Sequence, residues 1–364
     1  MGASGGAGGA GQAGAGGNAA AGTGGSGPLV CPVEATVLHS LTGATSLYLD
    51  LQTNGAVVVF LTSEAKQHFY LRTATLAVEQ AAMIPGPFNR TIDALRLSQS
   101  TMVFVSGGFV HFSTGQSGDP LCKGDAPDWS LVLPSCSAPN RRFAFNGSAL
   151  AMSGCGSIQS VGPIGTVCGK DVWVDSQIPA VGAADETLGL ALGTSLFTVE
   201  RLGGTYTVRE KSFQTPEKVK EFPTDSELAV VTGGDPAGAA LQGTFLYTSV
   251  RATATGKWDL RRYKIGAKTQ VPEILYSGID GLTAFALTDD GRVVWARKGG
   301  ILGAGATLWR GASGGEVNGG PPTLIGCAPI PPTNITVTPS YLFFADATPP
   351  EGAPPSLRGV ALPP

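Results

Sequence analysis

The chain has 364 residues, and its 24 Lys and Arg against 27 Asp and Glu give a formal net charge of -3. Nucleic-acid binding depends on a concentrated basic surface, so this balance argues against it. No apolar run reaches the roughly 20 residues that a membrane-spanning helix needs. The 53 glycines and 26 prolines interrupt the chain too often for long helices, which favours an all-β fold.

Residues 1–28 consist, after Met1, of small or uncharged residues such as Gly, Ala, Ser, Thr, Asn and Gln. A segment without large apolar side chains cannot offset the entropy cost of ordering, so we expect a disordered tether here. Residues 29–364 are expected to form a single propeller domain. Residues 1–28 lack a basic start and an apolar stretch, so they do not resemble a signal peptide. We expect an extracytoplasmic protein if an upstream signal exists, and a cytoplasmic one otherwise.

The region from Leu282 to Cys327 is the clearest repeat unit. Short apolar runs flank the turn Asp289-Asp290-Gly291, and a glycine after Asp is typical of a tight hairpin. Two further runs, Thr307–Arg310 and Thr323–Ile325, complete a four-stranded unit that we interpret as one blade of a β-propeller.

Looser copies of this unit follow one another from Glu34 onward, spaced by roughly 40–50 residues as in propeller blades. Their innermost strands are predicted to start near Leu47, Leu95, Phe143, Leu188, Leu228, Leu282 and Ile335. A second apolar run follows each of these, for example Val57–Leu61, Phe245–Tyr247 and Tyr341–Ala345. The sequence therefore predicts seven blades, with six as the alternative.

The two ends of the chain predict how the ring closes. The last repeat has predicted strands at Tyr341–Ala345 and Leu357–Leu362 but then ends one strand short of a blade. Near the start of the chain, the predicted strand Ala35–Leu41 has no blade of its own. Placing Ala35–Leu41 at the edge of the last blade would complete it and leave no long open edge.

Six cysteines in a chain with 14% charged residues indicate disulfides and an oxidising compartment. Cys31 and Cys327 lie beside the predicted closure, so a bond between them is expected. Two sets of pairs remain open for the other four: a local set, Cys122 with Cys136 and Cys155 with Cys168, or a set between blades, Cys136 with Cys155 and Cys122 with Cys168.

The segment Thr288-Asp289-Asp290-Gly291-Arg292-Val293-Val294-Trp295-Ala296 resembles the hairpin repeat of TolB-type bacterial propellers. The segment Tyr341–Asp346 is similar to another strand of the same group. A Gly/Ala-rich tether followed by a disulfide-bearing propeller also resembles uncharacterised bacterial surface lipoproteins. The resemblance implies a propeller fold, and fold alone does not transfer an activity.

Two weaker patterns are interpreted as structural. Gly311-Ala312-Ser313-Gly314-Gly315 matches the spacing of a hydrolase nucleophile elbow, but it follows a strand and precedes more glycine, so we interpret it as a loop. The three histidines, His39, His68 and His111, have no partner acid at a suitable spacing, so we assign them to strands rather than to catalysis.

A polar column precedes the predicted inner strands. It includes Asp93, Arg141, Glu186 and Asp280, which a propeller would gather around one mouth of its central channel. Three carboxylates against one arginine would favour a small cationic ligand or Ca²⁺. The most economical function is a non-catalytic binding or scaffold propeller outside the cytoplasm, with a protein, glycan or small cationic ligand as partner. The alternative is a propeller enzyme of the lyase, hydrolase or lactonase type that uses this acidic mouth.

Overall fold

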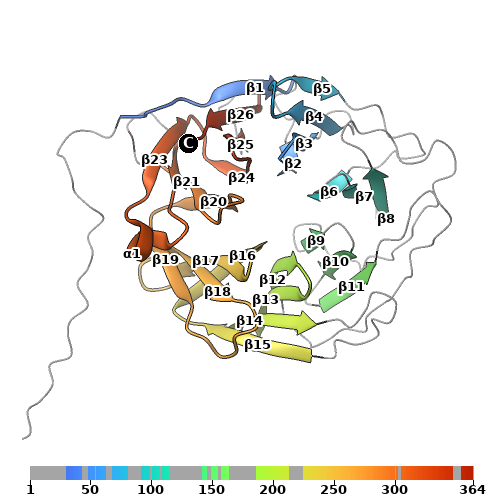
Figure 1. The fold of residues 1–364 in the computed structure, drawn as a ribbon, viewed down its shortest axis with the longest axis vertical. Helices are drawn as coiled ribbons and strands as arrows, with labels where there is room; N and C mark the ends of the chain where they lie inside the picture. The colour runs from blue at the N-terminus through green and yellow to red at the C-terminus, as the bar shows by residue number, and fades with distance from the viewer. Residues whose placement is uncertain are drawn as a thin grey trace, which may run out of the picture.

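The structure is a computed structural model that describes residues 30–42, 48–53, 55–62, 68–80, 92–98, 101–106, 109–114, 142–145, 149–154, 157–163, 186–212, 224–299, 301, 305–346 and 354–363. Within these residues the strands form seven antiparallel sheets, five of four strands and two of three. Figure 1 shows the sheets arranged as blades around a common axis. The prediction of a seven-bladed β-propeller is confirmed.

The blades follow one another along the chain, and the first strand of each lies nearest the axis (Figure 1). Blade 1 comprises β2 (Tyr48–Thr53), β3 (Val57–Thr62), β4 (His68–Arg72) and β5 (Val78–Gln80). Blade 2 comprises β6 (Ile92–Ser98), β7 (Thr101–Ser106) and β8 (Phe109–Thr114). Blade 3 comprises β9 (Arg142–Phe145), β10 (Ala149–Gly154) and β11 (Ser157–Pro163). Blade 4 comprises β12 (Glu186–Leu192), β13 (Leu196–Leu202), β14 (Thr205–Ser212) and β15 (Thr224–Val231). Blade 5 comprises β16 (Gly234–Gln242), β17 (Phe245–Ala252), β18 (Trp258–Lys264) and β19 (Glu273–Ile279). Blade 6 comprises β20 (Leu282–Leu287), β21 (Val293–Lys298), β22 (Ala306–Arg310) and β23 (Thr323–Ala328). Blade 7 comprises β24 (Pro332–Val337), β25 (Tyr341–Asp346), β26 (Ser356–Ala361) and β1 (Thr36–Ser40).

The second strands of blades 4 and 7 each contain a continuous buried run. β13 is buried over its first five residues, and β25 over its last five. Such a strand has a hydrogen-bonded neighbour on each side and a packed blade on each face, so it is a continuous apolar run rather than an alternating one. The second runs predicted from the sequence, such as Val57–Leu61 in β3, therefore match strands closely.

The hydrophobic core lies between neighbouring blades. One cluster joins blade 6 to blade 7 through Leu308 and Phe344, and another joins blade 4 to blade 5 through Phe197 and Tyr263. A third joins blade 7 to blade 1, where Phe343 packs with Phe60. Because each blade covers its neighbour, the burial that stabilises one blade depends on the next.

The N-terminal segment closes the ring. β1 pairs with β26 from Thr36 opposite Gly359 to Ser40 opposite Ser356, which completes blade 7. The strand predicted over Ala35–Leu41 is thus confirmed. Figure 1 shows β1 along the outer edge of this blade.

The residues before β1 also reach blade 6. The amide of Cys327 donates to the carbonyl of Val33 at 3.0 Å, and the amide of Ala35 donates to the carbonyl of Cys327 at 3.2 Å. A disulfide joins Cys31 to Cys327, with the two Cα atoms 5.8 Å apart. The N-terminal segment therefore binds two blades in succession.

One predicted inner strand was wrong. Leu228 lies in β15, the outermost strand of blade 4. The inner strand of blade 5 is β16, with the sequence GDPAGAALQ. Its small residues allow a close approach to blade 4, where a Cβ on Gly189 would lie 2.7 Å from the carbonyl oxygen of Gly238. This strand carries little apolar signal because packing there selects small side chains.

Several expectations concern residues outside the described ranges. They are the tether at residues 1–28, Arg141, and the cysteines Cys122, Cys136, Cys155 and Cys168. The short α1 (Gly315–Gly319), between β22 and β23, is the helix that the described residues contain. It is neither long nor apolar enough to cross a membrane.

Candidate functional site

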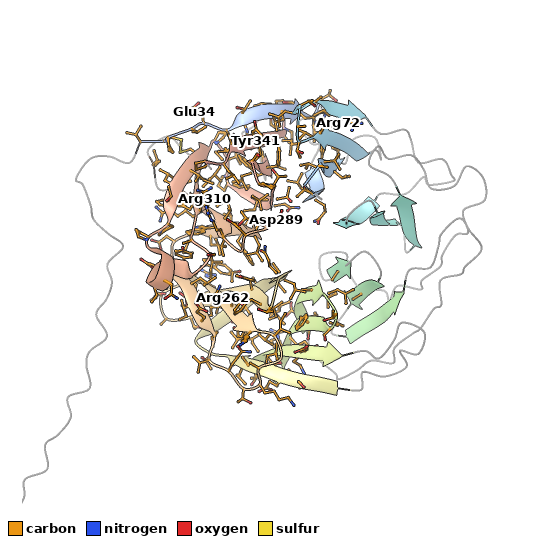
Figure 2. All side chains as sticks on the ribbon, in the orientation of Figure 1. Glu34, Arg72, Arg262, Asp289, Arg310 and Tyr341 are labelled. Atoms are coloured by element: carbon orange, nitrogen blue, oxygen red, sulfur yellow. A yellow bond between two sulfur atoms is a disulfide. The ribbon has the colours of Figure 1, made fainter. Side chains whose placement is uncertain are left out.

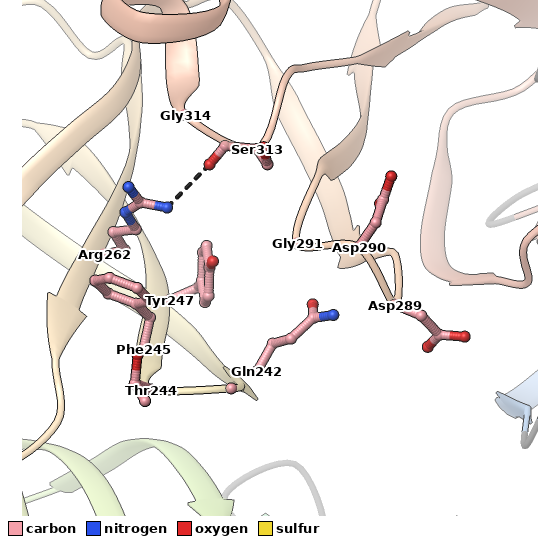
Figure 3. Close-up of a pocket in the computed structure, with 11 residues that line it drawn as sticks. Gln242, Thr244, Phe245, Tyr247, Arg262, Asp289, Asp290, Gly291, Ser313 and Gly314 are labelled. Carbon is pink, nitrogen blue, oxygen red and sulfur yellow. Dashed lines mark hydrogen bonds between the residues drawn. The ribbon is translucent and has the colours of Figure 1, made fainter.

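An open hollow of about 460 Å³ lies at the junction of blades 5 and 6. We call it the blade 5–6 hollow. Its wall comes from two hairpin turns, β16–β17 and β20–β21, together with β17, β18 and the loop after β22. The lining residues are Gln242, Gly243, Thr244, Phe245, Tyr247, Arg262, Asp289, Asp290, Gly291, Ser313 and Gly314. Figure 3 shows these side chains around the hollow.

Blade 5 supplies the aromatic side of the hollow. Gly243, with a φ of 55°, forms the tight turn between β16 and β17, and the chain then enters β17 at Phe245. Successive residues of a strand point to opposite faces, so Phe245 and Tyr247 lie on the same face. Arg262 on β18 pairs with Tyr247 in the sheet register, and its guanidinium lies 4.4 Å from the centre of the Phe245 ring.

Arg262 connects the two blades. Its Nε and Nη2 donate to the two carboxylate oxygens of Glu273 at 2.8 and 2.9 Å, and its Nη1 donates to the carbonyl of Ser313 at 2.9 Å (Figure 3 marks the latter). Burial alone would lower the pKa of Arg262. The hydrogen bonds to Glu273 and Tyr247 more than offset this effect, so the pKa is raised. Arg262 is therefore a permanent cation whose charge is neutralised by Glu273.

Ser313 contributes its backbone to this wall. The loop after β22 is held by Tyr276, whose hydroxyl accepts a hydrogen bond from the amide of Ala312 at 2.7 Å. A Cβ on Gly311 would lie 2.3 Å from the Tyr276 ring, so glycine is required at that position. The G-x-S-x-G spacing thus arises from packing, and Ser313 lies in the loop that the sequence predicted.

Blade 6 supplies the acidic side through the turn between β20 and β21. Thr288 accepts a hydrogen bond from the amide of Gly291 at 2.9 Å, and Gly291 has a φ of 80°, as the predicted Asp-Asp-Gly turn requires. Asp290 accepts a hydrogen bond from the Thr288 hydroxyl and pairs with Arg292 at 2.8 Å. Burial raises the pKa of Asp290, but the Thr288 hydroxyl and the Arg292 charge together lower it by more, so the pKa is lowered overall.

A second hollow, of about 220 Å³, lies on the other side of the same turn, at the junction of blades 6 and 7. We call it the blade 6–7 hollow. Asp289 and Asp290 line both hollows, and the second also has Arg292, Arg310, Pro339, Leu362 and Pro363 in its wall. Figure 2 shows Asp289 on the axis side of Arg262 and Arg310. The turn at Asp289 therefore separates two neighbouring hollows on one face.

The polar column predicted from the sequence lies at the other end of the inner strands. Asp280 precedes β20 and Asp289 follows it, so the two residues mark opposite faces of blade 6. Glu186 is the first residue of β12 and forms an ion pair with Arg201 at 3.1 Å. Asp280 forms an ion pair with Lys257 at 3.4 Å, with its side chain 71% exposed.

Glu186 and Asp280 thus have basic partners that the sequence did not indicate. Asp93 is the second residue of β6, its side chain is outside the described part, and Arg141 is outside the described ranges altogether. The shared site of these four residues therefore remains a prediction. Among the described residues there is no group of three His, Cys, Asp or Glu side chains suited to a metal ion. The Ca²⁺ site stays a prediction as well.

Comparison with known proteins places the fold. No family model and no curated protein matches the chain. Among solved structures, the chain is similar to the WD40 repeats of RRP9, with a TM-score of 0.57, 12% identity, and coverage of 92% of this chain and 99% of that one. It is also similar to the Cps50 (Swd1) β-propeller domain of Myceliophteria thermophila, with a TM-score of 0.56, 12% identity, and coverage of 90% and 100%.

A third similar chain comes from a crystal structure of the mitotic checkpoint complex, with a TM-score of 0.52, 13% identity, and coverage of 97% and 96%. At such identities the likeness shows the fold alone. The chain thus has the β-propeller fold, and WD40 propellers share its architecture. The repeated propeller unit expected from the sequence is thus confirmed, and the resemblance to TolB-type repeats stays a prediction.

Proposed function

We propose that this chain is a non-catalytic interaction propeller that binds a protein partner. The binding surface is the face that carries the β16–β17 and β20–β21 turns, which we call the hairpin face. The observation that carries the proposal is the pair of neighbouring hollows on this face, where aromatic, charged and apolar residues line adjoining walls. Mixed walls of this kind suit a polypeptide, because its backbone and side chains present all three chemistries.

The fold supports the same proposal. WD40 propellers have the same architecture, and one similar chain was solved within the mitotic checkpoint complex. A rigid ring of mutually packed blades holds turns from different blades in fixed positions, which preorganises a binding surface at little entropic cost. The hairpin face has this property, since Arg262 ties blade 5 to the Ser313 loop of blade 6.

Photo-crosslinking tests this proposal. A photoreactive residue at exposed Thr244, on the rim of the blade 5–6 hollow, is expected to give a crosslink to one defined protein. The same residue at exposed Leu202, the last residue of β13 and at the opposite end of the strands, is the matched control. The identified protein, once purified, should bind the chain saturably. Crosslinking from Leu202 alone, or no saturable binding, would contradict the proposal.

We further propose that the chain works outside the cytoplasm, tethered to a surface, in the manner of the TolB-like surface lipoproteins that its repeats resemble. The Cys31–Cys327 disulfide and the Gly/Ala-rich composition of residues 1–28 support this location. Protease treatment of intact cells should remove the protein, and an in-frame lipoprotein signal should precede its gene. Protection from protease in intact cells but not in lysed ones would contradict surface exposure.

A further inference from the structure

We propose that the blade 5–6 hollow receives the side chain of an arginine or lysine from the partner polypeptide, bound between Asp289 and Gln242. This inference rests on the proposed function, because it names the chemistry of the partner at that surface. The ligand group is a guanidinium or ammonium at the end of an alkyl chain.

The charges around the hollow leave one carboxylate uncompensated. Arg262 is held by both oxygens of Glu273, and Asp290 is paired with Arg292 at 2.8 Å. Within the described residues, Asp289 has no ion pair and no hydrogen bond to its carboxylate. The groups around the hollow therefore carry an excess negative charge. Figure 3 shows the Asp289 carboxylate turned away from Gln242, so binding requires the exposed Asp289 side chain to rotate toward the hollow. A cationic ligand is the complement of such a wall.

The hydrogen-bonding groups point to a donor as well. The Oε1 atom of Gln242 is buried and has no hydrogen-bond partner, although Gln242 lines the hollow. Buried polar atoms in proteins nearly always have a partner, because leaving one unpaired costs free energy. Figure 3 shows the Gln242 side chain projecting between Tyr247 and the turn at Asp289. A guanidinium or ammonium has only donors to offer, so it can serve both Gln242 and Asp289.

The wall opposite the carboxylate accommodates the alkyl part of such a side chain. Tyr247 and Phe245 line the hollow from blade 5, and Arg262 lies 4.4 Å from the centre of the Phe245 ring. Arg262 thus already shows, within the chain itself, how a guanidinium packs on this surface. Long basic side chains pack their methylene stems on apolar surface and keep the charged end in a polar setting.

A polypeptide fits the site better than a free amine. The hollow is open, and the turn at Asp289 and Asp290 also lines the blade 6–7 hollow, where Pro339, Leu362 and Pro363 provide apolar surface. An extended segment can place a basic side chain in the first hollow and its next residues over the second. A free amine would leave the second hollow unused.

Titration with capped tripeptides, followed by NMR of the labelled full-length chain, tests this inference without the natural partner. The probes are acetyl-Gly-Arg-Gly-amide and acetyl-Gly-Lys-Gly-amide, with the Gln and Glu peptides of the same form as controls. We expect saturable shifts at Gln242 and Tyr247 with the Arg and Lys peptides only, and weaker binding at high salt. Equal binding of the Gln or Glu peptide would overturn the inference.

Two substitutions locate the binding group. Asp289→Asn should weaken binding of the Arg peptide by about threefold, which is the effect expected for the loss of one exposed ion pair. Glu34→Gln, which neutralises an exposed carboxylate far from the hollow (Figure 2), should leave binding unchanged. Unchanged binding of the Asp289→Asn variant would overturn the site. Binding of free arginine as tightly as the capped peptide would overturn the assignment to a polypeptide.

The two proposals fail in different ways. If the crosslinked partner binds wild type and Asp289→Asn equally, the hairpin face remains an interaction surface and the basic-residue site is excluded. If the Arg peptide binds but no partner crosslinks from Thr244, the cation site stands without the proposed protein partner.

Discussion

At the scale of single residues, a buried ion pair within blade 4 constrains the fold. The Nζ of Lys211 lies 2.7 Å from the Oε1 of Glu200, with the two side chains 1% and 9% exposed. The Thr198 hydroxyl donates to the same carboxylate oxygen at 2.7 Å. An ion pair this deep is costly to desolvate, and it becomes much more costly when one partner is missing.

Lys211→Met should therefore destabilise the protein by about 3–5 kcal/mol, because it leaves the Glu200 carboxylate buried without its cation. Urea unfolding of the full chain, followed by tryptophan fluorescence, measures this change. The double variant Lys211→Met with Glu200→Gln is the control, and we expect it to recover much of the loss. A single variant as stable as wild type would contradict the role of the pair.

Asp346 lies at the end of β25, and its raised pKa makes folding stability depend on pH with the opposite sign to most carboxyl groups. Burial raises its pKa, and the Arg358 guanidinium, 3.1 Å away, lowers it by less, so the net shift is upward. A carboxyl whose folded pKa exceeds its unfolded one stabilises the fold below the unfolded pKa, and this contribution is lost as the pH rises through the folded pKa.

We therefore expect the free energy of unfolding of wild type, relative to Asp346→Asn, to fall as the pH rises from about 4 through the raised pKa of Asp346. Paired urea titrations of the two proteins over this range measure the difference. A difference that rises with pH would show that the Arg358 charge dominates over burial.

The sequence predicted the local backbone structure around the hollow better than it predicted which charged side chains pair there. The Asp-Asp-Gly turn was predicted, and its glycine has the expected positive φ. The unpaired state of Asp289 could not be predicted, because it depends on Glu273 neutralising Arg262 and on Arg292 neutralising Asp290. Similarly, the ion pairs of Glu186 with Arg201 and Asp280 with Lys257 depend on which strands and turns become neighbours.

At the scale of elements, the inner strands differ from the strands outside them. In blades 4 and 5 the inner strands approach each other closely, and this packing requires small residues at Gly189 and Gly238. Second strands are flanked on all sides and appear in the sequence as plain apolar runs. The sequence therefore located the second strand of blade 5 near Phe245, although it misplaced the inner strand beside it.

The substitution Gly189→Ala tests this convergence. A Cβ at this position would lie 2.7 Å from the Gly238 carbonyl oxygen and 2.8 Å from the Ala239 Cβ, so one inner strand must shift. We expect a loss of about 1–3 kcal/mol in urea unfolding, as for other overpacked positions. Gly189 is buried within β12, where alanine would otherwise be favoured over glycine. An unchanged or increased stability would show that blades 4 and 5 can separate without cost.

At the scale of the whole molecule, ring closure joins the two ends of the chain. β1 covers the edge of β26, and the residues before β1 bind β23 of the neighbouring blade. An uncovered edge strand exposes unpaired backbone groups and promotes edge-to-edge association. The closure was predictable because the last repeat lacked a strand and the first strand lacked a blade, whereas the added contact with β23 emerged only from the structure.

Deletion of residues 29–41 should therefore lower the melting temperature sharply and cause aggregation, because it uncovers β26 and β23 and removes Cys31 from its disulfide. Deletion of residues 2–28 is the matched control, and we expect it to leave the melting temperature nearly unchanged. The Cys31→Ser, Cys327→Ser double variant separates the two effects, since loss of the disulfide alone should cost about 2–4 kcal/mol and retain β1 on β26. Calorimetry and light scattering on the three proteins measure these outcomes. If both deletions shift the melting temperature equally, β1 does not hold the ring, and the blades must be stabilised by their mutual packing alone.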